Sequence, residues 1–532
     1  MSFIPVYLIF IPIISAMIIY MVNNKNINYL SFVSQGIISI LAIIYYINFD
    51  GLKNPQILNL GGWEKDIGIA LLNDKLSISF IFLSIIIWWI VLIYDWSKRK
   101  EEYKFLFFLL FLEGAFIGFL QTNDLFNFFV LIELVTILST ILIVYKKDGF
   151  SVRAGIYYLI FNSVGMIFYL IGLILLYSLS GTLNMEVIAN RISLFPGSHI
   201  VELSYIFIIA SMGVKSAFFP VYTWLPRAHG AAPASISALL SGLLVKSGLY
   251  GFIRINQMFK LEILEEFFFV LGFVTALSGV IFALSQKDIK QILAFHTISQ
   301  VGIILMGLEA MEGRLFIGGV MHIFNHAIFK SLLFLGAGII INQYGTRRIT
   351  EIRGVFKESP IVSIFMIVGM LSITGAPLFN GFVSKSIIKY GLKGNDLKVF
   401  SLQILNLGTA ISFVKFSQIF FGKSKVNKIK DISSTVGLGI LAILCIIMGN
   451  FFSDIVWEFM MYNVSYIKVF TFKNILTYVI TIGIGYLVYK GIIDKDYPII
   501  KKIRHINISF ENSNIMLVAF IFIMLIWTRI KV

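Results

Sequence analysis

The sequence has few cysteines and few charged residues. Its 532 residues include one cysteine, Cys445, which lies inside an apolar run. A single cysteine excludes disulfides within the chain, a zinc site ligated by cysteines and a cysteine-bound iron–sulfur cluster. Charged residues make up 13% of the chain and hydrophobic residues 58%, whereas charged residues form about 25% of an ordinary soluble protein. We therefore expect a polytopic membrane protein.

The sequence also lacks the motifs that hold common redox cofactors. It contains no dinucleotide-binding fingerprint, no haem motif and no set of cluster ligands. We therefore predict no cofactor, no metal site and no catalytic or redox centre on this chain. If the protein belongs to an oxidoreductase, the redox chemistry must take place on partner chains.

Apolar runs of about 20 residues follow one another along the chain, separated by short polar connections. Each run is too long and too uniformly apolar for a barrel strand, so the runs predict α-helical spans, about sixteen in all. The first run, 3–22, has no basic residues before it and no small-residue cleavage site after it. It is therefore predicted to be a retained helix rather than a signal peptide. The predicted fold class is an all-α polytopic membrane protein.

The net charge of +15 would suggest a nucleic-acid partner in a soluble protein. In a membrane protein, basic loops instead set the orientation, so we expect the lipid bilayer as a partner and no nucleic acid. When the loops are assigned to alternate sides, Lys and Arg accumulate on one side, in SKRKEEYK, YKKDGFSVR, QYGTRRITEIRGVFK, GKSKVNKIK and the 490–505 loop. This bias predicts a cell-membrane protein with those loops in the cytoplasm and both termini outside.

Two membrane-length segments within 205–255 each carry a lysine near the middle, Lys215 and Lys246. A charge at the bilayer centre costs several kcal/mol, so such residues indicate function by default. Lys246 lies about three helical turns from either end of its segment, too far to reach the headgroups easily. The connection between the two segments holds Arg227 and His229.

Two glutamates lie inside predicted spans, Glu113 in 104–121 and Glu133 in 124–145. Glu133 is nearly central, and a carboxylate buried there must pair with a cation or take up a proton. Glu113 is the weaker candidate, because Gly114 and Gly118 are the only other distinctive residues near it.

A third group of ionisable residues lies in the runs SQKDIKQILAFHTISQVG, which contains His296, and HIFNHAIFKSLLFLGAG. In the second run His322, His326 and Lys330 follow at i, i+4 and i+8, which places them on one helix face. The histidine spacing is also that of a zinc helix, but the metalloprotease glutamate between them is absent. We favour a proton relay over a metal site, with structural hydrogen bonding as the remaining alternative.

Two spans contain a proline near a lysine. Pro220 follows Lys215, and TGAPLFNGF precedes Lys385. A proline inside a span breaks or kinks the helix, and broken helices mark ion sites in transporters. These spans, predicted to be the seventh and twelfth, are an odd number of spans apart and so enter the membrane in opposite directions, which predicts two inverted five-helix repeats.

The predicted parts of the chain follow from these repeats. They are N-terminal scaffold helices (1–103), the first repeat (104–256), the second repeat (257–425) and C-terminal helices (426–532).

Five motifs occur in an order that resembles one family: NDLFNFFVLIEL, GVKSAFFPVYTWLPRAHGAAPASISALLSGLLVKSGLYG, KDIKQILAFHTISQVG, HIFNHAIFKSLLFLGAG and GAPLFNGFVSK. The family is that of the antiporter-like subunits of Mrp-type cation/proton antiporters, respiratory complex I and energy-converting hydrogenases. The resemblance covers about 105–425 and is closest to the Mrp D-type and hydrogenase branches. It implies about fourteen core spans, to which this chain adds about two at its C-terminus.

The resemblance also implies roles. It couples Glu133 with Lys215 and extends a midplane proton path through the remaining buried groups, Lys246, His322, His326, Lys330 and Lys385. Accessory candidates are Glu113, His229, His296 and Lys415. Because the buried lysines outnumber the buried glutamates, some lysines must be neutral at pH 7 and could carry protons.

We therefore expect a proton-translocating antiporter-like subunit of a hetero-oligomeric membrane complex. Whether sodium is exchanged stays open. The alternative is a membrane-arm subunit of a multi-subunit oxidoreductase, which shares the ion path and differs in the driving force.

Overall fold

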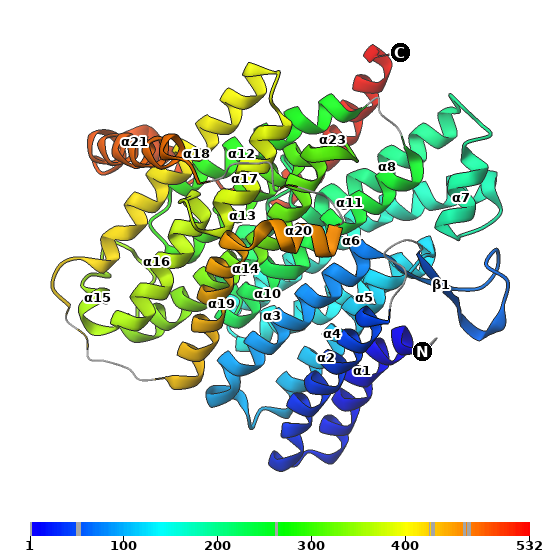
Figure 1. Ribbon diagram of the computed structural model, residues 1–532, viewed down its shortest axis with the longest axis horizontal. Helices are drawn as coiled ribbons and strands as arrows, with labels where there is room; N and C mark the ends of the chain where they lie inside the picture. The colour runs from blue at the N-terminus through cyan, green and yellow to red at the C-terminus, as the bar shows by residue number, and fades with distance from the viewer. Residues whose placement is uncertain are drawn as a thin grey trace. The chain divides into compact units, whose positions relative to one another are not determined.

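The computed structural model describes residues 3–48, 55–260, 264–424, 426, 431–460, 464 and 470–531. Part of the basic segment GKSKVNKIK, at 425 and 427–430, lies outside the described residues. The described chain is nearly all α-helical (Figure 1). Fifteen of its helices are long and apolar enough to cross a membrane, and Pro360–Thr374 is a shorter apolar helix. The predicted all-α polytopic membrane fold is confirmed, whereas the inverted repeats and the four-part division stay predictions.

The chain forms two compact units. Unit 1 comprises Met1–Ser216, Val245–Leu261 and Asn514–Val532, and unit 2 comprises Ala217–Leu244 and Glu262–Ser513. Glu113, Glu133, Lys215 and Lys246 belong to unit 1. The other candidate residues, from His229 to Lys415, belong to unit 2.

Unit 1 holds most of the first half of the chain. Its helices are α1 (Ile4–Val22), α2 (Leu30–Ile47), α3 (Lys75–Arg99), α4 (Tyr103–Gln121), α5 (Leu125–Ile143), α6 (Gly149–Ser180), α7 (Met185–Ile192), α8 (His199–Ser216) and α11 (Val245–Phe259). An antiparallel hairpin of β1 (Gln56–Asn59) and β2 (Ala70–Asn73), with Gln56 opposite Asn73, precedes α3.

Aspartates begin several of these helices. Asp74, Asp124 and Asp148 accept hydrogen bonds from backbone amides of the first turns of α3, α5 and α6, which satisfies donors that a helix start leaves open.

Asp74 also anchors α11. Its two carboxylate oxygens accept hydrogen bonds from Arg254 at 2.5 and 2.7 Å. Burial alone would raise the pKa of Asp74, but the charge and hydrogen bonds of Arg254 hold that pKa below its ordinary value. This bidentate pair ties α11, which carries Lys246, to the start of α3.

Unit 2 holds the helices α9 (Trp224–Ala231), α10 (Ala234–Leu239), α12 (Glu265–Ser285), α13 (Ile289–Gly307), α14 (Gly313–Tyr344), α15 (Val355–Glu358), α16 (Pro360–Thr374), α17 (Asn380–Gly391), α18 (Asp396–Ser417), α19 (Ile432–Asn450), α20 (Phe452–Met460), α21 (Phe472–Val488) and α22 (Pro498–Arg504). A π-helical turn, Leu240–Leu244, follows α10. The last helix, α23 (Phe510–Lys531), begins in unit 2 and continues in unit 1.

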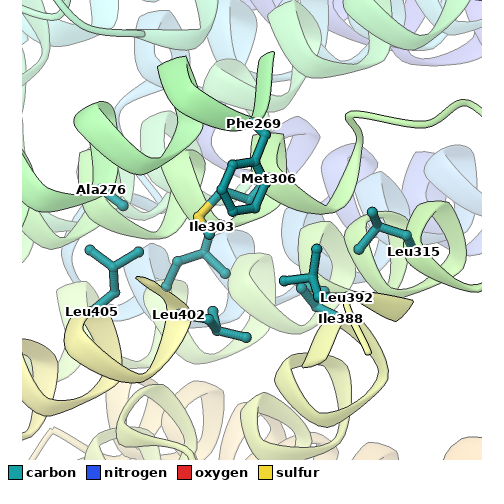
Figure 2. Close-up of a cluster of buried hydrophobic side chains, with 9 residues drawn as sticks. All are labelled: Phe269, Ala276, Ile303, Met306, Leu315, Ile388, Leu392, Leu402 and Leu405. Atoms are coloured by element: carbon teal, nitrogen blue, oxygen red, sulfur yellow. The ribbon is translucent and has the colours of Figure 1, made fainter. Parts of the chain in front are cut away.

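One cluster of buried apolar residues in unit 2 joins α12, α13, α14, α17 and α18. Figure 2 shows the buried side chains that these helices contribute: Phe269, Ala276, Ile303, Met306, Leu315, Ile388, Leu392, Leu402 and Leu405. Glycines bring α12 and α13 together, since a Cβ on Gly302 would lie 2.4 Å from the backbone oxygen of Gly272. Ile388 holds α17, and with it Lys385, against this core.

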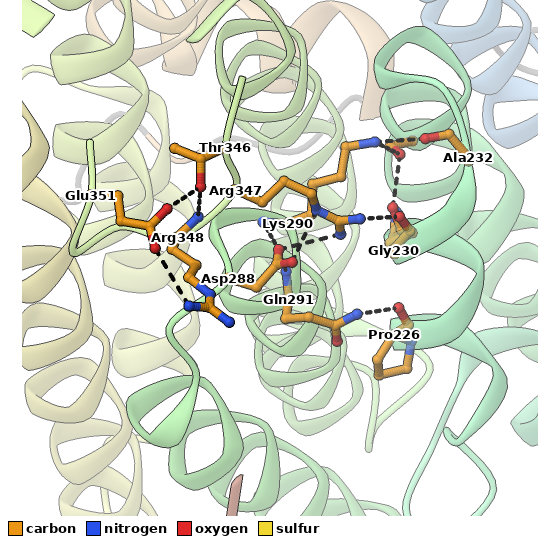
Figure 3. A network of polar contacts seen from close by, with 12 residues as sticks. Pro226, Gly230, Ala232, Asp288, Lys290, Gln291, Thr346, Arg347, Arg348 and Glu351 are labelled. Atoms are coloured by element: carbon orange, nitrogen blue, oxygen red, sulfur yellow. Dashed lines mark hydrogen bonds and ion pairs between the residues drawn. The ribbon is translucent and has the colours of Figure 1, made fainter. Parts of the chain in front are cut away.

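A polar network fixes α9 to the start of α13 (Figure 3). Lys290 donates to the carbonyl of Ala232 at 2.6 Å, and Gln291 donates to that of Pro226 at 2.9 Å. Arg347 donates to the carbonyl of Gly230 at 2.9 Å and pairs with Asp288. The segment that carries His229 is therefore held from two directions.

Candidate functional site

Glu133 and Lys215 form an ion pair inside unit 1. Lys215 lies in the last turn of α8 and donates to Glu133 Oε1 at 3.0 Å and to the Thr136 hydroxyl at 2.6 Å. The Ser163 hydroxyl of α6 donates to Glu133 Oε2 at 2.8 Å. The Lys215 side chain is 4% exposed and that of Glu133 is 18% exposed. The structure thus brings together the two residues that the resemblance couples.

Lys246 is fully buried near the start of α11. Gly248, two residues later, packs against the end of α8, where a Cβ would lie 2.6 Å from the Ser216 amide and 2.8 Å from the Lys215 carbonyl carbon. A glycine is needed there because backbone meets backbone. Lys246 therefore lies two residues before the glycine at which α11 contacts the end of α8.

Glu113 of α4 is fully buried and accepts a hydrogen bond from the Gln35 side chain of α2. Its partner is a neutral amide, in contrast to the cation that Glu133 contacts. The structure therefore gives Glu113 a place in the contact between α2 and α4.

His322 of α14 is buried between α13 and α17. Its Nε2 lies 3.2 Å from Gln300 Oε1 and its Nδ1 lies 2.8 Å from the Ser384 hydroxyl. A neutral ring can donate to Gln300 and accept from Ser384, while a protonated ring can donate to both, because the hydroxyl can reverse. His326, one turn later, is also buried, with its ring centroid 6.5 Å from that of His322.

Lys330 continues this face of α14. Its Nζ donates to the Leu293 carbonyl of α13 at 2.5 Å and lies 5.6 Å from the centroid of the Phe334 ring. His229 of α9 stacks on the same Phe334 ring at 4.5 Å. One aromatic ring thus contacts both Lys330 and His229.

His296 lies inside α13, fully buried and 4.9 Å from the Phe413 ring. Neither of its ring nitrogens has a hydrogen-bond partner among the described residues. His296 is therefore a buried titratable ring whose nitrogens have no assigned partner in the described part of the chain.

Two buried lysines hold helix ends. Lys385 of α17 donates to the Ile373 carbonyl, in the last turn of α16, at 2.7 Å. Lys415 of α18 donates to three carbonyls at the end of α12, those of Ala283, Leu284 and Gln286, at 2.7 to 3.0 Å. Both use the negative end of a helix as the acceptor. Three carbonyls around one ammonium mark Lys415 as a helix cap.

Unit 2 has a polar pocket beside each proline-containing connection. One, of about 440 Å³, is lined by Tyr222, Thr223, Pro226, Arg227, Phe282, Gln286, Gln291, Phe295 and residues 504–508. The other, of about 130 Å³, is lined by Thr374, Gly375 and Lys385 with parts of α18 and α21.

Arg504, at the rim of the larger pocket, binds Asp496 and the Ser285 carbonyl. Its hydrogen bond, with that of Lys287, lowers the pKa of Asp496 to about 2.

Several partners of these residues were not predicted from the sequence. Thr136, Ser163, Gln300 and Ser384 are ordinary polar residues whose contacts join different helices. The spacing of Thr136, three residues after Glu133, was the one local clue to its place on the same face. Among the described residues, no group of three or more His, Cys, Asp or Glu is placed to hold a metal ion.

The chain matches one protein family and several known proteins. The profile of the family "NADH:quinone oxidoreductase/Mrp antiporter, TM" matches residues 122–412. The chain is 31% identical to the D-type Na(+)/H(+) antiporter subunit of Alkalihalophilus pseudofirmus over 400 residues, which cover 73% of this chain and 81% of the relative. It is 30% identical to the D-type Na(+)/H(+) antiporter subunit of Bacillus subtilis over 434 residues, covering 78% and 87%.

Solved structures agree with the fold. An archaeal membrane-bound sulfane sulfur reductase, described as a respiratory membrane complex, contains a chain with a TM-score of 0.81 and 26% identity, covering 90% of this chain and 99% of that one. The Mrp complex of Dietzia sp. DQ12-45-1b contains a chain with a TM-score of 0.80 and 20% identity, covering 94% and 99%.

The ion pair predicts an asymmetric pattern of stability. Glu133→Gln should destabilise the protein more than Lys215→Met, because Lys215 is the more deeply buried partner and loses its counter-charge. Removing one member of a buried pair costs about 3–5 kcal/mol, and the partial exposure of Glu133 should reduce this loss for Lys215→Met. The double variant should recover part of the loss. Thermal unfolding of the purified protein measures each, with the exposed Lys104→Met as the control. Equal stability of all four variants would contradict the pairing.

Proposed function

Because the chain belongs to the NADH:quinone oxidoreductase/Mrp antiporter transmembrane family, we propose that it moves protons across the membrane through buried Glu, Lys and His side chains. It is an antiporter-like membrane subunit, and its proton path is the part proposed here. The observation that carries the proposal is the Glu133–Lys215 pair, in which two titratable groups in contact lie inside membrane spans.

In unit 1 the pair acts as a switch. While Glu133 is ionised, it stabilises the ammonium form of Lys215. A proton that reaches Glu133 removes this attraction, so Lys215 can then release its own proton and stay bonded to the Thr136 hydroxyl. Lys246, near the contact of α11 with the end of α8, is the proposed next carrier within the unit.

In unit 2 the proposed carriers are the two histidines, Lys330 and Lys385. His322 can pass a proton to or from the Ser384 hydroxyl of α17, which accepts or donates at its Nδ1. His326 lies one turn from His322 and one turn from Lys330 on α14. We keep His296 as an accessory candidate, because neither of its buried ring nitrogens has a hydrogen-bond partner among the described residues.

The two polar pockets are the proposed access points. The larger includes Gln286, beside the α12 end that Lys415 caps from the last turn of α18. The smaller includes Leu402 and Gln403 from the first half of α18. The pockets therefore lie toward opposite ends of α18, as access from opposite membrane faces requires.

The exposure of Glu133 supports a neighbouring subunit. Phe126, Val130 and Ile137 of α5 are exposed, and the side chain of Glu133, which lies between Val130 and Ile137 in the sequence, is 18% exposed. A carboxylate facing lipid is costly, so we propose that another membrane subunit covers this face.

Sodium is the ion that we propose is exchanged for protons, because relatives are named as subunits of Na(+)/H(+) antiporters. The alternative is the membrane arm of an oxidoreductase, which the similarity to a chain of an archaeal respiratory complex favours. Purification of the assembly in mild detergent distinguishes the antiporter from the oxidoreductase. Co-purifying iron–sulfur or nickel subunits would indicate the oxidoreductase, whereas small hydrophobic subunits alone would indicate the antiporter.

We propose the cell membrane as the location, with both termini outside, from the bias of basic loops. Single cysteines at Lys98, Lys147 and Arg348 in a Cys445→Ser background should then resist an impermeant thiol reagent added to sealed cells. The same sites should react after the cells are opened, which controls for accessibility. Labelling of these sites in sealed cells would indicate the opposite orientation.

Lys330 and Lys415 should respond differently to arginine, which keeps the charge but does not release its proton. Lys330→Arg should abolish proton uptake by vesicles that contain the complete assembly, because a carrier must lose its proton. Lys415→Arg should retain most of the uptake, because a cap needs only a cation at the carbonyls of α12. Proton uptake by Lys330→Arg as fast as that by Lys415→Arg would contradict the carrier role of Lys330.

A further inference from the structure

Helix α21 lies beyond the segment that matches the family, residues 122–412, and it is unusual among the apolar helices. It is the least buried of the candidate membrane spans, because only 11% of its most apolar stretch of residues is buried. Its outer face is apolar, and Val479, Ile480 and Leu487 are among its exposed residues. Several other residues of α21 are polar.

Four polar residues of α21 follow a helical spacing. Asn474, Thr477, Tyr478 and Thr481 lie at i, i+3, i+4 and i+7, which places them on one face. All four line the pocket of about 130 Å³ that contains Lys385. The polar face of α21 therefore points toward a buried lysine of α17.

Other polar residues also line this pocket, namely Ser386 and Lys389 of α17 and Gln403 and Asn406 of α18, together with the apolar Phe382 and Leu402. Lys389 and Gln403 are exposed, whereas Lys385, one turn before Lys389, is 5% exposed. The carboxamide oxygen of Asn406 is buried with no hydrogen-bond partner among the described residues. The pocket thus leads from exposed polar groups to the buried ammonium.

A pair of hydroxyls separates this pocket from an apolar one. The hydroxyls of Thr374 and Tyr478 lie 3.0 Å apart, and both residues line both pockets. On their other side is a cleft of about 890 Å³ with mainly apolar walls, to which Met370, Phe413 and Ile482 contribute. The polar pocket therefore ends at this hydroxyl pair, close to the Ile373 carbonyl that binds Lys385.

We infer that α21 forms one wall of a polar vestibule, lined by Asn474, Thr477, Tyr478 and Thr481, through which water and protons reach Lys385. This inference rests on the proposed function in that Lys385 is a proton carrier. It gives the C-terminal part of the chain a role in transport, since without α21 the polar faces of α17 and α18 around Lys385 would face lipid.

The test compares two neighbouring positions of α21. Single cysteines replace Thr481, on the vestibule face, and Ile480, which is 51% exposed on the apolar face, in a full-length Cys445→Ala background. A charged methanethiosulfonate reagent modifies a thiol that water reaches, because the thiolate is the reactive form. The protein stays in membrane fragments that the reagent can reach from both faces.

We expect Thr481→Cys to react at least about tenfold faster than Ile480→Cys, since only its thiol meets water that can take up its proton. We also expect an anionic reagent to react faster than a cationic one at Thr481→Cys, because Lys385 and Lys389 line the same pocket. Equal, slow reaction at both positions would overturn the vestibule. Thr477→Cys, on the same face, provides a second variant should Thr481→Cys fold poorly.

Proton uptake by the modified assembly then connects the vestibule to transport. Modification of Thr481→Cys should reduce uptake several-fold, whereas the same treatment of Ile480→Cys should leave uptake unchanged. Fast labelling with unchanged uptake would overturn the role of the vestibule for Lys385. The labelling rates do not depend on transport, so they stand even if Lys330→Arg shows that the proposed proton path is wrong.

Discussion

A lysine buried in a membrane protein needs an oxygen acceptor at its Nζ, and the helices around Lys215, Lys385 and Lys415 supply one in different ways. Lys215 contacts a carboxylate and a hydroxyl, Lys385 contacts one helix-end carbonyl and Lys415 contacts three. A neutral amine keeps two N–H groups and gains a lone pair. Lys385 can therefore lose a proton and keep its hydrogen bond, whereas Lys415 would turn its lone pair toward a carbonyl. The number and type of oxygen acceptors thus distinguish the proposed proton carriers, Lys215 and Lys385, from Lys415, which caps a helix.

The same requirement connects the fold to the path. The last turn of a helix leaves carbonyls that no amide of that helix satisfies, and Lys385 and Lys415 bind such carbonyls at the ends of α16 and α12. The apolar cluster that joins α12, α13, α14, α17 and α18 holds α18, which carries Lys415, against α12. The glycines of α12 and α13, and Gly248 of α11, bring backbones close enough for side chains of one helix to lie within reach of the next.

Much of this could be predicted from the sequence, because hydropathy reports burial and the ionisable residues stand out in apolar runs. The spans, and the position of Lys215, Lys246 and Lys330 inside them, follow from such patterns alone. The role of Lys415 does not, since its acceptors are backbone carbonyls about 130 residues away that have no side-chain signature. The polar face of α21 has a readable spacing, but Thr and Tyr are tolerated in any span, and the pocket beside them shows what they face.

The central claim is that protons pass through the Glu133–Lys215 pair, and proton uptake by sealed vesicles that contain the complete assembly tests it most directly. We expect Glu133→Ala and Lys215→Ala each to abolish uptake when vesicles that contain equal amounts of the assembly are compared, because each leaves the switch without one of its two titratable groups. Uptake above half of the wild-type rate in either variant would contradict the claim.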